Sequence, residues 1–295
     1  MKNLAASIQD RLKNRSRESG VPLNRLLEDF AIARLFARLS DSNYSEKFIL
    51  KGAQLFTLWA NEPHRPTRDA DFLSYGAPDT EVLESVFNDI CALQTEPLDG
   101  LEWMPGKAAP IREDNPYGGE RIKLFALLGR MRIPVQIDVG FGDAITPAPK
   151  TSEWPMPLDF PPAPLLVYCP ETTIAEKLHA AEILGTANSR MKDFFDLFWL
   201  CKNRDFDGGE LHDALRATFE RRSTALPVSA PSAFTEAFYS LPDKQNQWAA
   251  FLRKSRLDPL ELQEVCEQIA CFLGPAMAGV VGGKRWLPNN GWTEV

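Results

Sequence analysis

An alternating run over residues 132–141 is the feature that most constrains the fold. Its apolar members occupy every second position: Ile133, Val135, Ile137, Val139 and Phe141. Successive side chains of a β-strand point to opposite faces, so this period of two predicts a strand with one buried face. Gln136 and Asp138 lie on the other face. A second strand is predicted over 121–128, with a hairpin turn at Gly129-Arg130.

The remaining pattern predicts an α+β fold. Two helices are expected over 3–40, a third within 48–59 that begins near Lys51-Gly52, and a fourth over 79–93. A strand is expected over 69–74, and no regular structure is expected after Gly279. Beyond residue 170 the pattern is helical, over 171–184, 190–202, 209–222, 231–240, 244–255 and 259–273. This order of elements is typical of an α+β core followed by a helical domain.

Prolines mark the expected domain boundary. Residues 147–170 contain eight of the 23 prolines in the chain. Proline lacks the backbone N–H that helices and central strands need, so such a segment favours a linker. We therefore expect N-terminal helices over 1–40, a core domain over 41–165 and a helical C-terminal domain over 166–295.

Composition excludes several classes of protein. The 295-residue chain has a net charge of −7, which argues against a surface that binds nucleic acid all over but allows a local basic groove. No apolar run reaches the ~18 residues of a membrane span, and the charged N-terminus does not resemble a secretory signal. The five cysteines are scattered and only three histidines are present, so a zinc site is not expected. We expect a cytoplasmic protein with no membrane partner.

Two carboxylates on the predicted strand 69–74 indicate a metal site. Asp69 and Asp71 stand at i and i+2 and therefore share one face of that strand. Carboxylate oxygens are the ligands that Mg²⁺ prefers. If the two strands are neighbours, Asp138 adds a third carboxylate, and three can hold two metal ions for in-line phosphoryl displacement. Two alternatives remain, because Asp138 could instead face solvent or pair with an arginine.

Five motifs in a fixed order resemble the AbiEii/AbiGii family of toxin nucleotidyltransferases, which includes the MenT toxins. The resemblance covers about residues 40–200. It consists of Phe48-Ile-Leu-Lys-Gly-Ala, Arg65-Pro-Thr-Arg-Asp-Ala-Asp71, Gln136-Ile-Asp-Val-Gly-Phe-Gly-Asp143, Ala175-Glu-Lys-Leu-His179 and Asn188-Ser-Arg-Met-Lys-Asp-Phe-Phe-Asp196. The resemblance implies the minimal nucleotidyltransferase fold, a mixed sheet with flanking helices, followed by a helical extension that completes the active site.

In such proteins a Gly-Ser or Gly-Gly helix start and the DxD motif hold the nucleoside triphosphate and the metal. Here the helix start is Gly52-Ala53, which lacks the hydroxyl of a serine. The resemblance implies that Lys51, Gly52 and Thr67 contact the nucleotide, and that Mg²⁺ or Mn²⁺ is held by Asp69, Asp71 and Asp138.

The resemblance also assigns roles on two later helices. Lys177 matches the essential lysine of the family and would offset phosphate charge. Arg190 would contact the nucleotide, and Asp193 would be a further catalytic carboxylate, acting either as a general base or as the group that orients Lys177. The residues alone allow a simpler reading, in which Arg190 with Asp193 and Lys192 with Asp196 form ordinary helix ion pairs.

Transfer of a nucleotidyl group from a nucleoside triphosphate is the function that this resemblance implies. The acceptor would be an RNA, expected to be a tRNA 3′ end, so that modification blocks translation, and an antitoxin would be the partner protein. Two alternatives remain open. The acceptor could be a protein side chain, or the chain could be a non-catalytic regulator that binds nucleotide or RNA.

Overall fold

The computed structural model describes residues 2–60, 64–77, 79–111 and 118–294. They form two compact units. The first contains Met1–Gly142 and Lys150–Val167, and the second contains Asp143–Pro149 and Tyr168–Val295. Within the described residues, no helix is both long enough and apolar enough to cross a membrane.

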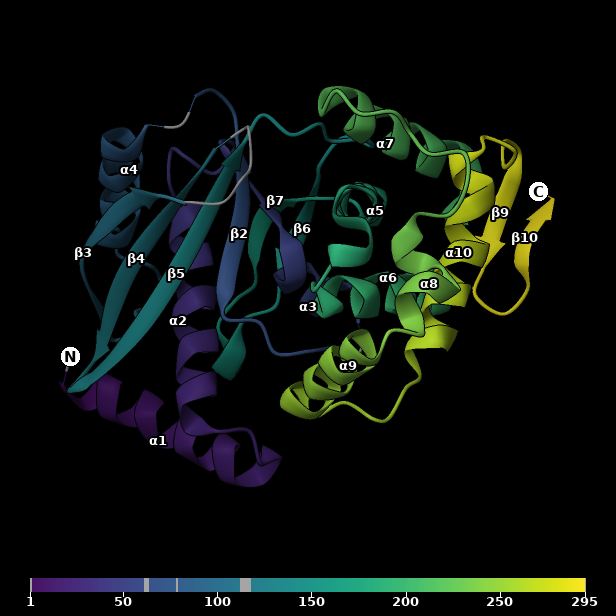
Figure 1. Cartoon of the computed structure of the whole chain (residues 1–295). Helices are drawn as coiled ribbons and strands as arrows, with labels where there is room; N and C mark the ends of the chain where they lie inside the picture. The colour runs from purple at the N-terminus through teal and green to yellow at the C-terminus, as the bar shows by residue number, and fades with distance from the viewer. Residues whose placement is uncertain (1, 61–63, 78, 112–117, 295) are drawn as a thin grey trace. The chain divides into compact units, whose positions relative to one another are not determined.

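A seven-stranded mixed sheet organises the first unit (Figure 1). Its strand order is β3-β4-β5-β2-β1-β7-β6; β2 runs parallel to β5 and β1 parallel to β7, and the other neighbours are antiparallel. The elements of the unit are α1 (Lys2–Ser19), α2 (Leu23–Ser40), β1 (Phe48–Lys51), η1 (Gly52–Leu55), α3 (Phe56–Trp59), β2 (Asp69–Ser74), α4 (Thr80–Ala92), β3 (Leu101–Pro110), β4 (Gly119–Leu128), β5 (Met131–Phe141), β6 (Lys150–Trp154), η2 (Pro157–Asp159) and β7 (Ala163–Val167).

Helices α2 and α4 cover one face of this sheet. Phe36 of α2 packs edge-on against Phe72 of β2, with ring centroids 5.7 Å apart. Phe87 of α4 packs in the same way against Phe48 of β1, at 5.2 Å. Because side chains alternate along a strand, Asp71, which adjoins Phe72, projects to the opposite face. The apolar side chains of β5 therefore face the helices, and its polar side chains face away from them.

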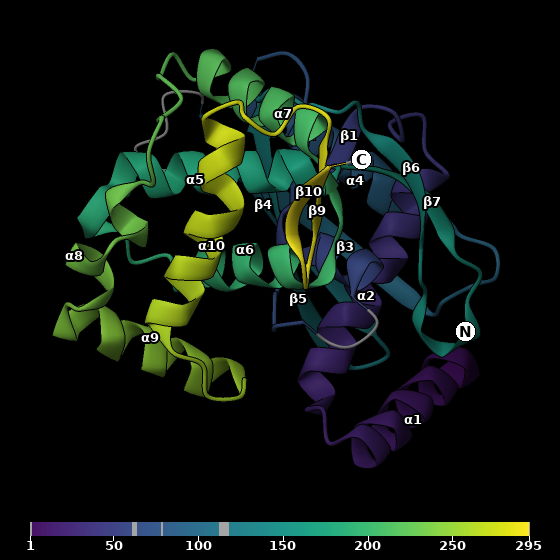
Figure 2. The same cartoon turned by 90° about the vertical axis from the view of Figure 1, so that its right-hand side faces the viewer.

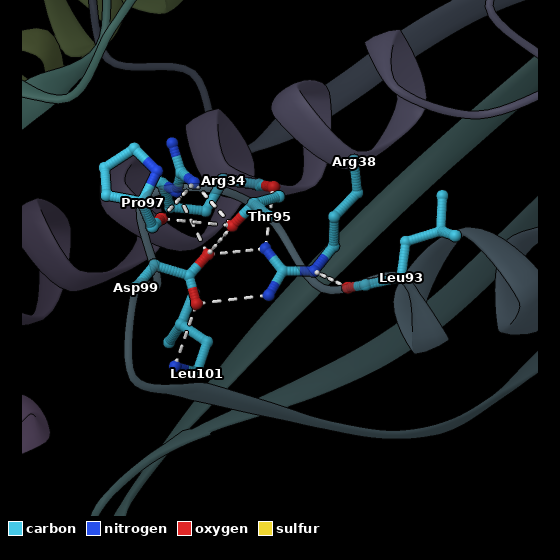
Figure 3. A network of polar contacts seen from close by, with 7 residues as sticks. All are labelled: Arg34, Arg38, Leu93, Thr95, Pro97, Asp99 and Leu101. Atoms are coloured by element: carbon cyan, nitrogen blue, oxygen red, sulfur yellow. Dashed lines mark hydrogen bonds and ion pairs between the residues drawn. The ribbon is translucent and has the colours of Figure 1, made fainter. Parts of the chain in front are cut away.

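A buried polar cluster fastens α2 to the segment that precedes β3 (Figure 3). Asp99 accepts hydrogen bonds from Arg34 Nε at 3.0 Å and from both terminal nitrogens of Arg38 at 2.5 and 3.1 Å. Arg34 also donates to Thr95 Oγ1 at 2.6 Å. Burial alone would raise the pKa of the Asp99 carboxyl, but the two guanidinium groups outweigh it and hold the pKa below its usual value.

The proline-rich segment contains structure that the sequence analysis did not predict. Strands β6 and β7 form an antiparallel pair, and β7 joins β1 through Leu50 and Val167. Trp154 at the end of β6 packs edge-on against Phe36, with centroids 4.9 Å apart. Prolines are tolerated here because most of them lie between strands, and Pro164, which lies within β7, precedes Val167, where β7 pairs with β1.

The second unit is mainly helical. Its elements are α5 (Pro170–Leu184), η3 (Gly185–Ala187), α6 (Met191–Asn203), β8 (Phe206–Asp207), α7 (Gly208–Arg221), η4 (Ser232–Phe234), α8 (Glu236–Tyr239), α9 (Pro242–Ser255), α10 (Leu262–Met277), β9 (Lys284–Leu287) and β10 (Gly291–Glu294). The helices agree with those predicted after residue 170, within a few residues at most ends.

The prediction of an irregular tail after Gly279 is wrong. Strands β9 and β10 form a hairpin that pairs with β8 in a small sheet of order β10-β9-β8, beside α10 (Figure 2). Trp286 is fully buried and packs against Phe272 of α10, and its Nε1 donates to the Cys201 carbonyl at 2.7 Å. Burial of these aromatic rings stabilises strands that are too short to be recognised by their pattern.

Candidate active site

A row of four charged residues crosses one face of the sheet in the first unit. The strand register places Lys51 opposite Asp71, Asp71 opposite Asp138, and Asp138 opposite Arg121. Residues directly opposite one another on neighbouring strands project to the same face. The row therefore reads basic, acidic, acidic, basic across β1, β2, β5 and β4. We refer to these four residues as the charged row.

Asp69 and Asp71 lie on β2 as the sequence analysis predicted. The two half-buried residues share the face that bears the charged row, and Asp69 lies opposite Gln136 of β5. The neighbouring position of β2 and β5, on which the prediction of a third carboxylate depended, is confirmed. Two carboxylates from one strand and one from the next are thus gathered at the same place on the sheet.

The turn at Gly52 packs directly against this pair of strands. Gly52 begins η1, where the chain leaves β1, and it has a φ of +73°, a conformation that residues with a side chain rarely adopt. A β-carbon at this position would overlap Oδ2 of Asp71. The predicted helix near Lys51-Gly52 is present as η1 followed by α3. Thr67 lies in the extended segment just before β2, where its carbonyl accepts a hydrogen bond from Arg25 of α2.

Lys51 extends across the face toward β5. Its Nζ lies 3.8 Å from the place that a β-carbon on Gly140 would occupy. Gly140 stands two residues after Asp138 and on the same face of β5. The ammonium group therefore lies over β5, close to Gly140 and on the face that bears Asp138.

Asp138 is held by Arg121 in a bidentate ion pair. Arg121 Nε donates to Oδ1 at 2.8 Å, and the NH2 nitrogen donates to Oδ2 at 2.7 Å. Gln136 also approaches Oδ1, at 3.4 Å. The arginine pairing that the sequence analysis left open for Asp138 is the one observed. In the described part of the chain, no three acidic, histidine or cysteine side chains already surround a point where a metal ion could bind.

The donor set nevertheless suits Mg²⁺. This ion keeps several of its waters and is usually bound by one or two carboxylates together with substrate phosphates. Asp69 and Asp71 supply two such carboxylates on one face. Asp138 adjoins them in register and could join them if Arg121 released it.

A second cluster lies within the second unit. Lys177 of α5 makes ion pairs with two aspartates of α6, at 2.6 Å to Asp193 Oδ1 and 2.8 Å to Asp196 Oδ2. Arg190, the residue before α6, donates from Nε to Asp193 Oδ2 at 2.5 Å. The side chain of Asp196 is completely buried and that of Lys177 is 11% exposed, whereas that of Arg190 is 46% exposed. The cluster is thus a buried lysine between two carboxylates, with one accessible guanidinium group.

The surroundings of Asp193 keep it ionised. Burial alone would raise the pKa of its carboxyl, but Lys177 and Arg190 outweigh this effect and hold the pKa below its usual value. Each of its oxygens accepts from one of these cations. The expected pair between Arg190 and Asp193 is present, while Asp196 contacts Lys177 of the neighbouring helix.

Two residues of these clusters, Arg121 and Asp196, were not predicted as site residues from the sequence. Each followed a detectable pattern. Arg121 alternates with buried Glu120 and Ile122 on β4, which places it on the polar face of the sheet. Asp196 stands three residues after Asp193, and residues at that spacing lie on the same side of a helix. Neither pattern reveals the partner residue, because each partner lies on a different element.

Comparisons with known proteins give one matching family and several similar solved structures. The model of the AbiEii nucleotidyl transferase toxins of type IV toxin–antitoxin systems matches residues 34–268. JHP933 from Helicobacter pylori is a structural relative, with 16% identity and a TM-score of 0.46 over 86% of this chain and 90% of that chain. A candidate nucleotidyltransferase, also from H. pylori, has 17% identity and a TM-score of 0.44 over 86% of this chain and 93% of that chain.

A comparison with curated proteins gives no match. The family match covers well over half of the 295 residues and includes both the charged row and the Lys177 cluster. The chain therefore belongs to the AbiEii family of toxin nucleotidyltransferases, whose substrate is a nucleoside triphosphate and whose partner is a cognate antitoxin.

Proposed function

We propose that the protein transfers a nucleoside monophosphate from a nucleoside triphosphate to an RNA, with a tRNA 3′ end as the acceptor, in a reaction that depends on Mg²⁺ or Mn²⁺. The observation that carries the metal dependence is the pairing of Asp71 with Asp138 in adjacent strands, with Asp69 on the same face. Mg²⁺ held there would neutralise charge on the reacting phosphates. Modified tRNA would no longer support translation, which accounts for toxicity.

The residues around the carboxylates fit a triphosphate. Gly52 keeps the backbone close to Asp71 without a side chain, so a phosphate group can approach there. Lys51 brings an ammonium group to the same face and would offset phosphate charge. Thr67, at the entrance to β2, is proposed as a further phosphate contact.

The second cluster would support the same reaction. In the transfer, an RNA hydroxyl oxygen forms a bond to the α-phosphorus and the bond from that phosphorus to the bridging oxygen breaks. Pyrophosphate leaves with the electron pair, and the hydroxyl proton passes to water. Lys177 and Arg190 would offset the charge on the phosphates. Asp193 would orient Lys177, because both of its oxygens are engaged and its pKa is lowered.

Label transfer tests this proposal. The purified chain would be incubated with Mg²⁺, total RNA and each α-labelled nucleoside triphosphate in turn. Asp69→Asn is the test variant, and Asp89→Asn is the matched control, because Asp89 is a carboxylate on α4, the helix that packs on the opposite face of the sheet. Label on a tRNA-sized band that requires Asp69 but not Asp89 supports the proposal. Label on protein would favour the alternative acceptor, and labelling that persists in a chelator would exclude metal dependence.

A further inference from the structure

The open face of β4 and β5 continues beyond the charged row as a strip of basic and aromatic side chains. Arg121, Lys123 and Phe125 stand at alternate positions of β4 and so share one face, each about 6.8 Å from the next. Arg132 of β5 lies on the same face, with its guanidinium 3.7 Å from the centre of the Phe125 ring. We call Lys123, Phe125 and Arg132 the β4–β5 track.

The track has the charge and chemistry of a site for single-stranded nucleic acid. Lys123 and Arg132 are exposed, whereas the whole chain carries a net charge of −7. Basic side chains contact phosphates, and an aromatic ring or a stacked guanidinium offers a surface for a base. Local positive charge on an acidic protein concentrates polyanions at that place.

A cleft lies between Asp69 and two residues of the track, Lys123 and Phe125. It has a volume of about 270 Å³, and its lining residues belong to the first unit: Glu28, Arg68, Asp69, Lys123, Leu124, Phe125, Pro134, Val135 and Gln136. Strand β5 begins earlier than its parallel neighbour β2, whose first residue, Asp69, lies opposite Gln136. Residues 133–135 of β5 therefore have no neighbour in β2, and the cleft lies beside them. Figure 1 shows β3, β4 and β5 extending side by side away from the rest of the sheet.

The direction of the reaction assigns the track to the acceptor. In an in-line displacement the attacking oxygen approaches opposite the leaving group. The proposed function puts the triphosphate beside Gly52, at the end of β1, and beside the Lys51 ammonium group, which lies near Gly140, beyond Asp138 along β5. The track lies on the other side of the carboxylates, along β4. The attacking hydroxyl would therefore arrive from the track.

We propose that the β4–β5 track binds the single-stranded 3′ end of the acceptor RNA and leads its terminal hydroxyl to the carboxylates of the charged row. The proposal rests on the proposed function. Lys123 contacts a phosphate of the strand, and Phe125 with Arg132 supports a base. These residues determine acceptor affinity and leave nucleotide affinity unchanged.

Binding of a labelled tRNA pool tests the track without turnover. Affinities would be measured in an Asp69→Ala background, with Lys123→Glu and Phe125→Leu as test variants. Phe125→Leu keeps an apolar side chain and removes the aromatic face. Lys150→Glu is the matched control, because Lys150 is an exposed lysine on β6, at the opposite edge of the same sheet.

Lys123→Glu is expected to weaken tRNA binding about ten-fold and to reduce the slope of log Kd against log salt by about 0.7, the value for one phosphate contact on a single strand. Phe125→Leu is expected to weaken binding at least five-fold, which is the lower end of the loss for one stacked base. With an active chain, KM for the RNA should rise while KM for the nucleoside triphosphate stays constant. Lys150→Glu should change none of these quantities.

The outcomes separate this inference from the proposed function. If the wild-type chain labels RNA and the track variants bind tRNA as tightly as Lys150→Glu does, the track is wrong and the proposed function stands. If the wild-type chain labels only protein, the proposed function and the track both fail. Equal rises of KM for RNA and for nucleoside triphosphate in Lys123→Glu would also overturn the track, because they would indicate a general effect on the site.

Discussion

Gly52 packs so closely against Asp71 that the carboxylate occupies the place where a β-carbon would be. The contact joins the turn after β1 to the strand that bears the DxD motif. Gly52 also has a positive φ of +73°. Two independent requirements therefore select glycine here, one from the backbone conformation and one from the space beside the carboxylate.

Gly52→Ala is expected to abolish activity, because the new methyl group must displace Asp71. Gly20→Ala is the matched control, since Gly20 has a φ of +70° but nothing within 4 Å of the place that a β-carbon would occupy. Both substitutions carry the strain of a positive φ, about 1 kcal/mol. Only Gly52→Ala should also weaken Mn²⁺ binding, as measured by electron paramagnetic resonance, and reduce label transfer at least 100-fold. Similar losses in both variants would show that backbone strain alone is responsible.

Arg121→Gln is expected to raise the affinity of the chain for Mn²⁺ several-fold. The bidentate pair occupies both oxygens of Asp138, and its removal frees a third carboxylate beside Asp71. Affinity would be measured by isothermal titration without nucleotide. The control is Lys123→Gln, which removes one positive charge two residues along the same strand. An equal gain in the control would attribute the effect to net charge.

The sequence predicted the parts of this protein whose pattern is local. The strand that carries Asp69 and Asp71 was placed at its observed limits, and the β4–β5 hairpin was recognised from its alternation and its Gly129-Arg130 turn. Both depend on neighbours in the chain. Strand β3 was missed because Pro105 and Gly106 interrupt its alternation. Strands β6 and β7 were missed because each has only five residues within a proline-rich segment, and pairing with other strands stabilises them.

The sequence pattern also placed the acidic residues of the candidate site on one face of β2, and their role there stays a prediction. The acidic residues were recognised because carboxylates that share one strand face are costly unless they are paired or bind a metal ion. Their partners did not stand out. Arg121 is one arginine among many until the register places it opposite Asp138, and Asp196 is one helix carboxylate among many until α5 brings Lys177 to it. Which basic residue neutralises which acid is decided by tertiary contacts.

Asp193→Asn is expected to lower kcat about 100-fold without changing the shape of the pH–rate profile. Its oxygens contact Lys177 and Arg190, so the substitution disturbs their positions without removing a base. The profile of kcat/KM would be measured from pH 5 to 9 for the wild type and the variant. Loss of the acidic limb in the variant would instead identify Asp193 as the general base.

Asp99→Asn is expected to destabilise the chain by about 3–5 kcal/mol, because it leaves two buried guanidinium groups without their counter-charge. The pKa of Asp99 is lowered, so its contribution is present above the unfolded pKa of about 3.9 and is lost at lower pH. Urea unfolding at pH 7 would measure the loss. The control Asp159→Asn breaks an exposed pair with Arg11 and should change stability by less than about 0.5 kcal/mol. Equal losses would argue against burial as the cause.

His179→Gln is expected to make the chain less sensitive to mild acid. Burial and the neighbouring Arg222 lower the pKa of His179 to about 4, against the opposing effect of Asp143. Arg222 can only donate, so Nδ1 accepts from it at 3.2 Å and Nε2 must carry the proton that it donates to Thr224. Arg222 in turn pairs with Asp143 and Glu176.

The folded chain therefore resists protonation of His179 while the unfolded chain accepts it near pH 6.5, so stability falls as the pH decreases from 6.5 toward 4. For this half-buried ring, solvent screening reduces the expected loss between pH 7 and 5 to about 1 kcal/mol. Glutamine can accept from Arg222 and donate to Thr224 but does not titrate. Urea unfolding at both pH values would measure the difference, and an equal pH dependence in wild type and variant would show that other groups cause it.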